Sequence, residues 1–203
     1  MAVERIPYIT PEEYLERERK AEFKSEYYGG QIYAMAGASM EHVTICTNIS
    51  GELRDALKNG RCRTFASDLR LSTDPDGLYT YPDVFVVCGK PLLTDSHMDT
   101  VTNPTLIIEV LSDSTEKHDR GAKFAHYRQI QSLREYVLVS QHAPTVEQYV
   151  RQDNGKWLYS SVSGLEASVE FPSVAVTLQL SEVYRNVEFP EPKASDGEAG
   201  HGR

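Results

Sequence analysis

The chain contains little cysteine, a single tryptophan and no long hydrophobic run. Its three cysteines, Cys46, Cys62 and Cys88, are odd in number and far apart. They show neither the spacing of a zinc site nor the framework of a disulfide-rich protein, so we expect all three thiols to be buried as small hydrophobic side chains. No apolar stretch approaches the roughly 20 residues that cross a bilayer, and no signal peptide is evident. We therefore expect a cytoplasmic protein that does not associate with a membrane.

The chain also lacks an excess of positive charge. With 21 basic against 30 acidic residues, its formal net charge is −9, so no global electrostatic attraction draws it toward nucleic acid. This balance disfavours a strong non-specific DNA-binding protein. It does not exclude an enzyme whose local groove is basic or whose carboxylates are screened by metal ions.

The order of predicted elements indicates one domain in which helices precede, interrupt and follow strands. Thr10, Pro11 and Glu13 in "ITPEEYLERERK" form a capping box that begins a helix, and Gly29 and Gly30 mark a tight turn. We predict an α/β (α+β) domain over residues 1–187 and a disordered tail over residues 188–203. The other predicted elements are helices at 40–58 and 115–130 and strands at 32–36, 63–72, 83–88, 105–111, 135–140, 145–151, 156–162 and 174–180.

The segment "PTLIIEVLS" places a glutamate inside a nearly continuous apolar run. Residues 105–111 have the pattern of a strand that is buried on both faces of a sheet, and Glu109 lies within it. Burying an unpaired carboxylate is costly unless it is protonated, paired or bound to a metal. One interpretation is a carboxylate that a buried arginine or backbone donors satisfy. The other is a functional acid.

A second carboxylate opens the preceding apolar strand, in "YPDVFVVCG". Pro82 favours an extended start, and Asp83 stands at the strand mouth, where aspartate is also common as a turn or capping residue. If the two strands are neighbours, Asp83 and Glu109 point at one place. Like charges this close repel each other unless a divalent cation lies between them. Hard oxygen ligands with no histidine or cysteine nearby favour Mg²⁺ or Mn²⁺ over zinc.

The segment "STEKHDRGAKFAHYRQI" supplies a third component. Asp119, Lys123 and Tyr127 follow one another at four-residue steps, so they fall on one helical face. An exposed Asp119–Lys123 pair would contribute only about 0.3–0.5 kcal/mol to stability. In the functional interpretation Lys123 points at the two carboxylates, positions a water and neutralises charge in the transition state of phosphoryl chemistry.

Together these segments resemble the PD-(D/E)XK nuclease superfamily, and more closely its Uma-type restriction endonuclease family. The resemblance covers residues 10–184 and rests on the order of "EYYGGQIYAMAGAS", "YPDVFVV", "IIEVLSDST", "DRGAKFAHY" and "EYVLVS". It implies a restriction-endonuclease-like core, a mixed central sheet flanked by helices with the site at one sheet edge. It also implies a Mg²⁺-dependent endonuclease that hydrolyses phosphodiester bonds in DNA. Asp83 and Glu109 would hold the metal, with the backbone carbonyl of Val110 as a further ligand.

The sequence departs from the superfamily pattern at one position. The lysine that normally follows the glutamate by two residues is replaced by Leu111, so the resemblance assigns its role to Lys123. This departure and the acidic composition leave two alternatives open. One is a catalytically inactive nuclease-fold module that regulates or binds other proteins, and the other is a metal-dependent hydrolase of a different substrate. By analogy, a homodimer would supply the two sites needed to cut both DNA strands.

Three further residues match recurrent positions of the family. Glu26 would supply another carboxylate, or is one of many surface glutamates in its segment. His42 is either a base or a capping or packing histidine at a helix start. Asp68 either faces the site from its strand or satisfies Arg70 or a turn.

Overall fold

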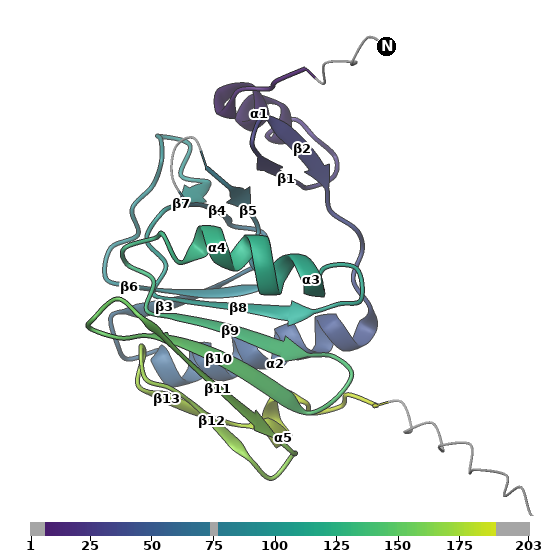
Figure 1. Cartoon of the computed structure of the whole chain (residues 1–203), viewed down its shortest axis with the longest axis vertical. Helices are drawn as coiled ribbons and strands as arrows, with labels where there is room; N and C mark the ends of the chain where they lie inside the picture. The colour runs from purple at the N-terminus through teal and green to yellow at the C-terminus, as the bar shows by residue number, and fades with distance from the viewer. Residues whose placement is uncertain (1–6, 74–76, 190–203) are drawn as a thin grey trace, which may run out of the picture.

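The computed structural model describes residues 7–73 and 77–189, and its largest unit is a six-stranded sheet (Figure 1). Strands β8 and β9 run parallel at its centre and the other neighbours pair antiparallel, so the sheet is mixed, as predicted. None of the helices in this described part is long and apolar enough to cross a bilayer. In spatial order the strands are β11 (Trp157–Ser163), β10 (Thr145–Arg151), β9 (Glu135–Ser140), β8 (Leu106–Leu111), β6 (Val84–Cys88) and β3 (Cys62–Ala66).

One face of the central sheet is covered by the longest helix and a C-terminal unit (Figure 1). The helix α2 (Met40–Leu57) was predicted at this place, and its buried side chains Ile45, Ile49 and Leu53 belong to the core on this face. The C-terminal unit consists of the hairpin of β12 (Ser168–Phe171) and β13 (Val176–Gln179) followed by α5 (Leu180–Val183). These elements enclose the larger hydrophobic core.

The opposite face carries the helical stretch predicted over residues 115–130 (Figure 1). It is not a uniform α-helix. The short helices α3 (Glu116–His118) and α4 (Phe124–Tyr127) are joined by a π-helical segment, η1 (Asp119–Lys123). Tyr127 packs in a second core between this stretch and the sheet. Both faces of the sheet are therefore covered, which confirms the predicted α/β (α+β) class with flanking helices.

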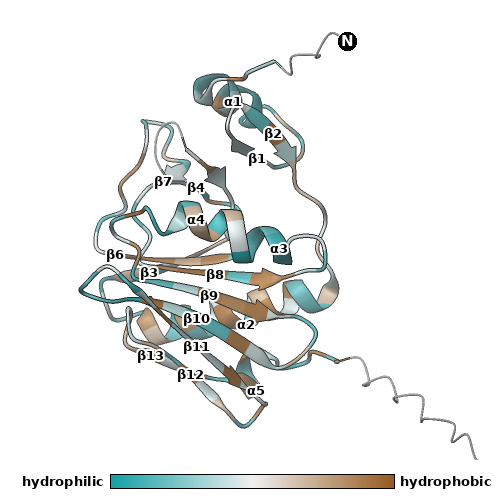
Figure 2. Ribbon diagram, viewed as in Figure 1, coloured by the Kyte–Doolittle hydropathy of each residue, from teal (hydrophilic) through white to brown (hydrophobic). Residues whose placement is uncertain are grey.

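The two cores explain the nearly continuous apolar pattern of β8. Ile108 and Val110 belong to the core beside α2, whereas Ile107 and Leu111 belong to the core beside the α3–α4 stretch. Successive side chains on a strand point to opposite faces, so Glu109 faces η1. The hydrophobic colouring of β6, β8 and β9 in Figure 2 reflects this burial on both sides.

A second sheet of five strands carries the N-terminal region. Helix α1 (Pro11–Glu18) begins with the predicted capping box: the Thr10 hydroxyl accepts from the Glu13 N–H at 3.2 Å, and the Glu13 carboxylate accepts from the Thr10 N–H at 3.0 Å. The predicted turn is also confirmed, since Gly29 and Gly30 have φ angles of 58° and 83° that favour glycine. In order the strands are β2 (Gln31–Ala34), β1 (Ser25–Tyr28), β5 (Tyr79–Thr80), β4 (Arg70–Ser72) and β7 (Thr100–Val101).

One predicted strand is divided between the two sheets. Residues 63–72 were expected to be continuous, but β3 ends in the central sheet and β4 begins in the second sheet. The chain turns between them, where the backbone N–H of Asp68 donates to the Ala66 carbonyl at 2.7 Å. The sequence also does not predict β1 (Ser25–Tyr28), β5, β7 and β12, because strands of two to four residues are too short to show a clear alternation.

Cys62 and Cys88 form a disulfide, contrary to the expectation of three free thiols. They lie directly opposite each other on the antiparallel strands β3 and β6, which their sequence separation of 26 does not reveal. Cys46 is the free cysteine and lies partly buried on α2. Disulfides are rare in a reducing cytoplasm, so the state of this pair in the cell bears directly on the cytoplasmic location expected from the sequence.

The tail predicted over residues 188–203 lies outside the described residues, apart from Glu188 and Phe189. The Phe189 ring centroid is 5.3 Å from that of Tyr184. The described C-terminal segment therefore still contacts the larger core at this point.

Candidate active site

Asp83 and Glu109 lie side by side at the ends of two neighbouring strands. Strands β6 and β8 pair antiparallel with Val84 opposite Ile108, so the next step along the pair brings Asp83 to Glu109. The backbone N–H of Asp83 donates to Glu109 Oε2 at 3.3 Å, and the backbone N–H of Val110 donates to Asp83 Oδ2 at 2.8 Å. The two acids and the peptide of Val110 thus form one contiguous group.

Lys123 reaches this group from η1. Its Nζ lies 3.0 Å from Glu109 Oε1, 3.3 Å from Glu26 Oε1 and 3.5 Å from Asp119 Oδ1. The Lys123 and Asp119 side chains are only 8% and 4% exposed, so the alternative of an exposed surface pair is wrong. π-Helical turns are rare and occur often at functional sites, which agrees with the position of this one beside buried charges.

Two hydroxyl groups complete the contacts of the buried carboxylates. The Tyr127 hydroxyl donates to Glu109 Oε1 at 2.8 Å, and the Thr80 hydroxyl donates to Glu26 Oε1. Glu109 is therefore satisfied by Lys123, Tyr127 and a backbone N–H, and its described contacts include no arginine. The sequence offers no signal for Thr80, which comes from the short strand β5 of the second sheet.

Burial dominates the electrostatics of this cluster. It raises the pKa of Glu109 above the usual 4.5; the Lys123 ammonium opposes this rise, and the charges of Asp83 and Asp119 add to it. Burial alone would lower the pKa of Lys123, but the carboxylates of Glu109, Glu26 and Asp119 hold that pKa well above 10.5. Lys123 is thus a permanent cation among an excess of acidic groups.

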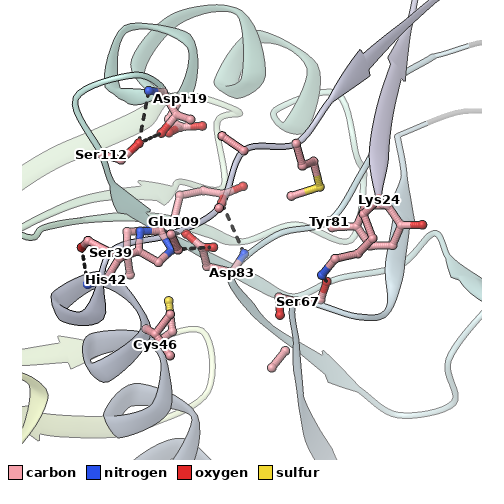
Figure 3. A pocket seen from close by; sticks show the side chains of 18 of the residues that line it. Lys24, Ser39, His42, Cys46, Ser67, Tyr81, Asp83, Glu109, Ser112 and Asp119 are labelled. Carbon is pink, nitrogen blue, oxygen red and sulfur yellow. Dashed lines mark hydrogen bonds and ion pairs between the residues drawn. The ribbon is translucent and has the colours of Figure 1, made fainter. Parts of the chain in front are cut away.

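His42 and Cys46 approach Asp83 from the other side of the sheet. The Ser39 hydroxyl caps α2 by accepting from the His42 N–H at 3.1 Å, and His42 Nε2 lies 3.1 Å from Asp83 Oδ1. Possible ligand atoms of His42, Cys46 and Asp83 all lie within 4.8 Å of one another. Figure 3 shows both side chains pointing from α2 toward Asp83. The expectation that no histidine or cysteine lies near the acids is therefore wrong.

An open cleft of about 1220 Å³ gives access to this cluster. Asp83, Glu109, Lys123 and His42 are among its lining residues. Asp68 does not line it: the side chain is 94% exposed and pairs with Lys24 at 2.9 Å. The structure thus brings together all the sequence-predicted site residues except Asp68. The spacing of His42 and Cys46, one helical turn apart, is the signal that could have identified Cys46 as well.

Comparisons with known proteins agree with this architecture. A family model described as "Uma2: Putative restriction endonuclease" matches residues 11–182. In Synechocystis sp., "Uncharacterized protein sll1609" is 39% identical over 171 residues, covering 84% of this chain and 97% of the relative. "Uncharacterized protein slr1290" from the same organism is 36% identical over 184 residues, covering 91% of this chain and 95% of the relative.

A solved structure has the same fold. It is a crystal structure from Anabaena variabilis described as "a putative nuclease belonging to DUF820", with a TM-score of 0.69 and 22% identity, covering 87% of this chain and 97% of that chain. At this identity the match shows a shared fold and no more. The family model, by contrast, spans most of the sequence, and the chain belongs to the Uma2 family.

Proposed function

We propose that the protein is a metal-dependent endonuclease that hydrolyses phosphodiester bonds in DNA. The observation that carries the proposal is the contact of Lys123 with Glu109 beside Asp83, at the ends of two neighbouring strands. This set of two acids and an amine resembles the PD-(D/E)XK constellation, with the lysine supplied by η1. The family description supports a nuclease-type hydrolase in general terms.

The acidic groups of the cluster fit a hard divalent cation. Asp83, Glu109 and Glu26 provide carboxylate oxygens, and the backbone carbonyl of Val110 would be a further ligand; Mg²⁺ and Mn²⁺ prefer such oxygen donors. Several carboxyl groups surround one ammonium, and a divalent ion would offset the remaining negative charge. When bound, the ion would supply Lewis acidity, lowering the pKa of a coordinated water and reducing charge on the phosphate.

The protein's own residues position the reacting groups. Because Lys123 stays protonated, it acts as a fixed positive charge next to the scissile phosphate and not as a base. Glu109 and Asp119 hold the ammonium in place. Asp83 is held by the Val110 N–H on one oxygen and by His42 on the other, so its carboxylate has a defined orientation.

The cleft beside the cluster is the proposed DNA site. Lys24 and Arg54 line it and are exposed. Parts of the cleft are therefore basic, although the chain as a whole carries a net charge of −9. Local basic groups are sufficient to contact phosphates. Cutting both strands of a duplex would require two such sites, so a homodimer is part of this proposal.

A cleavage assay on the full chain tests the proposal. Supercoiled plasmid and single-stranded DNA are incubated with Mg²⁺ or Mn²⁺, with EDTA as the metal-free condition. We expect metal-dependent cutting that falls by about 10²–10³-fold in Asp83→Asn and in Lys123→Met. Asp153→Asn, which changes an exposed acid in the turn between β10 and β11, away from the residues that line the cleft, is the matched control and should cut like the wild type. Circular dichroism verifies that each variant is folded.

Two outcomes would contradict the assignment. Cutting that persists in Asp83→Asn and Lys123→Met would place the catalytic groups elsewhere. A folded protein that cuts neither DNA under any metal condition would favour the non-catalytic module.

A further inference from the structure

A second set of metal-binding side chains lies next to the proposed Mg²⁺ site. A ring nitrogen of His42, the Cys46 thiol and a carboxylate oxygen of Asp83 lie within 4.8 Å of one another. Because His42 and Cys46 are one helical turn apart in α2, they project toward the same point, the end of β6 that carries Asp83 (Figure 3). Ligand atoms around a tetrahedral zinc ion lie roughly 3.5 Å apart, so small side-chain rotations complete the site.

His42 has ligand capacity that its neighbours do not use. Nε2 lies 3.1 Å from Asp83 Oδ1, whereas Nδ1 is buried and has no hydrogen-bond partner among the residues that the structure describes. Buried polar nitrogens almost always have a partner. Cys46, one turn further along, is a free thiol. Neither ring nitrogen of His42 is therefore engaged by a described residue outside the group of His42, Cys46 and Asp83.

We propose that His42, Cys46 and Asp83 bind a thiophilic divalent ion, with zinc as the ion of choice, and that zinc bound here inhibits the nuclease. Imidazole and thiolate donors suit zinc, whereas Mg²⁺ prefers oxygen donors and would leave the thiol uncoordinated. Three protein ligands leave a fourth position for water, as in many zinc sites. The inhibitory half of the proposal rests on the proposed nuclease function; the binding half does not.

Inhibition follows from the position of Asp83, which belongs to both sets of ligands. Its Oδ2 accepts from the Val110 N–H beside Glu109, and its Oδ1 faces His42. A carboxylate drawn toward zinc is withdrawn from the cation held with Glu109, so the two ions compete. Burial and the nearby acids raise the pKa of the Cys46 thiol, and metal binding accordingly displaces a proton from it.

Cobalt(II) is the probe for the binding half. With the Cys62–Cys88 disulfide intact, Cys46 is the chain's single thiol, so a thiolate-to-cobalt charge-transfer band in the near ultraviolet reports on this site alone. We expect the full chain to bind one Co²⁺, which Zn²⁺ displaces and excess Mg²⁺ does not. Cys46→Ser should remove the band.

A matched pair of histidine variants locates the second ligand. His42→Gln should weaken Co²⁺ binding by more than about 10–100-fold, the loss that removing only an outer-shell partner causes. His97→Gln, at an exposed histidine outside the group, should bind Co²⁺ like the wild type. The absence of a band in the wild type, or a band that survives Cys46→Ser, would overturn the proposal.

The inhibitory half is measured on Mg²⁺-dependent plasmid cutting with increasing Zn²⁺, each variant being compared with its own zinc-free rate. Wild-type cutting should fall as zinc fills the site seen with cobalt, and Cys46→Ser should require at least about tenfold more zinc. If zinc inhibits both proteins alike, the regulatory role is wrong. If the cobalt band forms but no DNA is cut under any condition, the metal site stands and the nuclease assignment fails.

Discussion

Lys123 Nζ lies 3.0 Å from Glu109 Oε1. This contact joins the π-helical segment η1 to the central strand β8. The glutamate is tolerated inside an apolar strand because the ammonium, the Tyr127 hydroxyl and the Asp83 N–H contact its two oxygens. The same ammonium contacts Glu26 of β1. One side chain therefore links the central sheet, the second sheet and the helical stretch.

Replacing Lys123 by methionine should destabilise the fold. The substitution leaves the carboxylates of Glu109, Glu26 and Asp119 without the cation they share, and removing one partner of a buried ion pair costs about 3–5 kcal/mol. Urea unfolding at pH 7 in EDTA measures the loss. Lys24→Met, which removes a more exposed pair with Asp68, should cost at most about 1 kcal/mol. Equal stabilities of the two variants would show that the Lys123 contacts are energetically unimportant.

Tyr127→Phe tests the hydroxyl contact to Glu109. A hydrogen bond contributes about 1 kcal/mol to stability, and about 1.5–3 kcal/mol when one partner is charged, so the loss should be about 1–3 kcal/mol because both side chains are buried. Tyr159→Phe is the control, since its hydroxyl contacts Glu147 at 3.3 Å from an exposed position; its effect should be within about 0.5 kcal/mol. Similar unfolding free energies for both variants would contradict the role assigned to the Tyr127 hydroxyl.

Acid should weaken the fold partly through Asp99. The Arg19 guanidinium, which donates to this carboxylate at 2.7 Å, is the main reason that the pKa of Asp99 lies well below its usual 3.8, and Arg70 at 3.0 Å adds to it. At acid pH the unfolded chain then binds more protons than the folded chain. The stabilisation is complete above about pH 4 and is lost as the pH falls further.

Unfolding by urea at pH 7 and at pH 3 measures this loss. Asp99→Asn should reduce the difference between the free energies of unfolding measured at the two pH values. Asp153→Asn, at an exposed residue in a hairpin turn, should keep the wild-type difference. An unchanged acid sensitivity in Asp99→Asn would rule out this carboxylate as a contributor.

Reduction of the Cys62–Cys88 disulfide should lower the free energy of unfolding. Opening a loop with a sequence separation of 26 costs about 2–4 kcal/mol, because the unfolded chain gains conformational freedom. Urea unfolding with and without dithiothreitol measures the change. Cys46→Ala should respond to reductant like the wild type, whereas the double variant Cys62→Ala/Cys88→Ala should not respond. A wild type that is insensitive to reductant would contradict the stabilising role.

The two acids of the candidate site were predictable because a carboxylate in or beside an apolar strand is costly to bury unless it is paired. Glu109 interrupts a run that is otherwise apolar, and Asp83 occupies the matching position of the preceding strand. Lys123 and Tyr127 were predictable from their four-residue step. The sequence predicted the long strands and α2 for a similar reason, since their patterns extend over several residues.

The remaining features depend on contacts between distant segments. The register of β3 against β6 pairs Cys62 with Cys88, and no local pattern encodes that register. Thr80 reaches Glu26 only because β5 pairs directly with β1 in the second sheet. Cys46 is a candidate metal ligand only because it lies near Asp83, which belongs to a distant segment of the chain.

The wide turn of η1 determines the direction in which the side chains after it in the helical stretch point. A π-helical turn contains about one residue more than an α-helical turn, so deleting one residue there, such as Gly121, would narrow the turn and change how Lys123 and Tyr127 lie relative to Asp119 even if every other side chain were kept. Chain length in this short stretch is therefore under tighter constraint than its composition. Relatives that retain this chemistry should tolerate substitutions between Asp119 and Lys123 more readily than insertions or deletions.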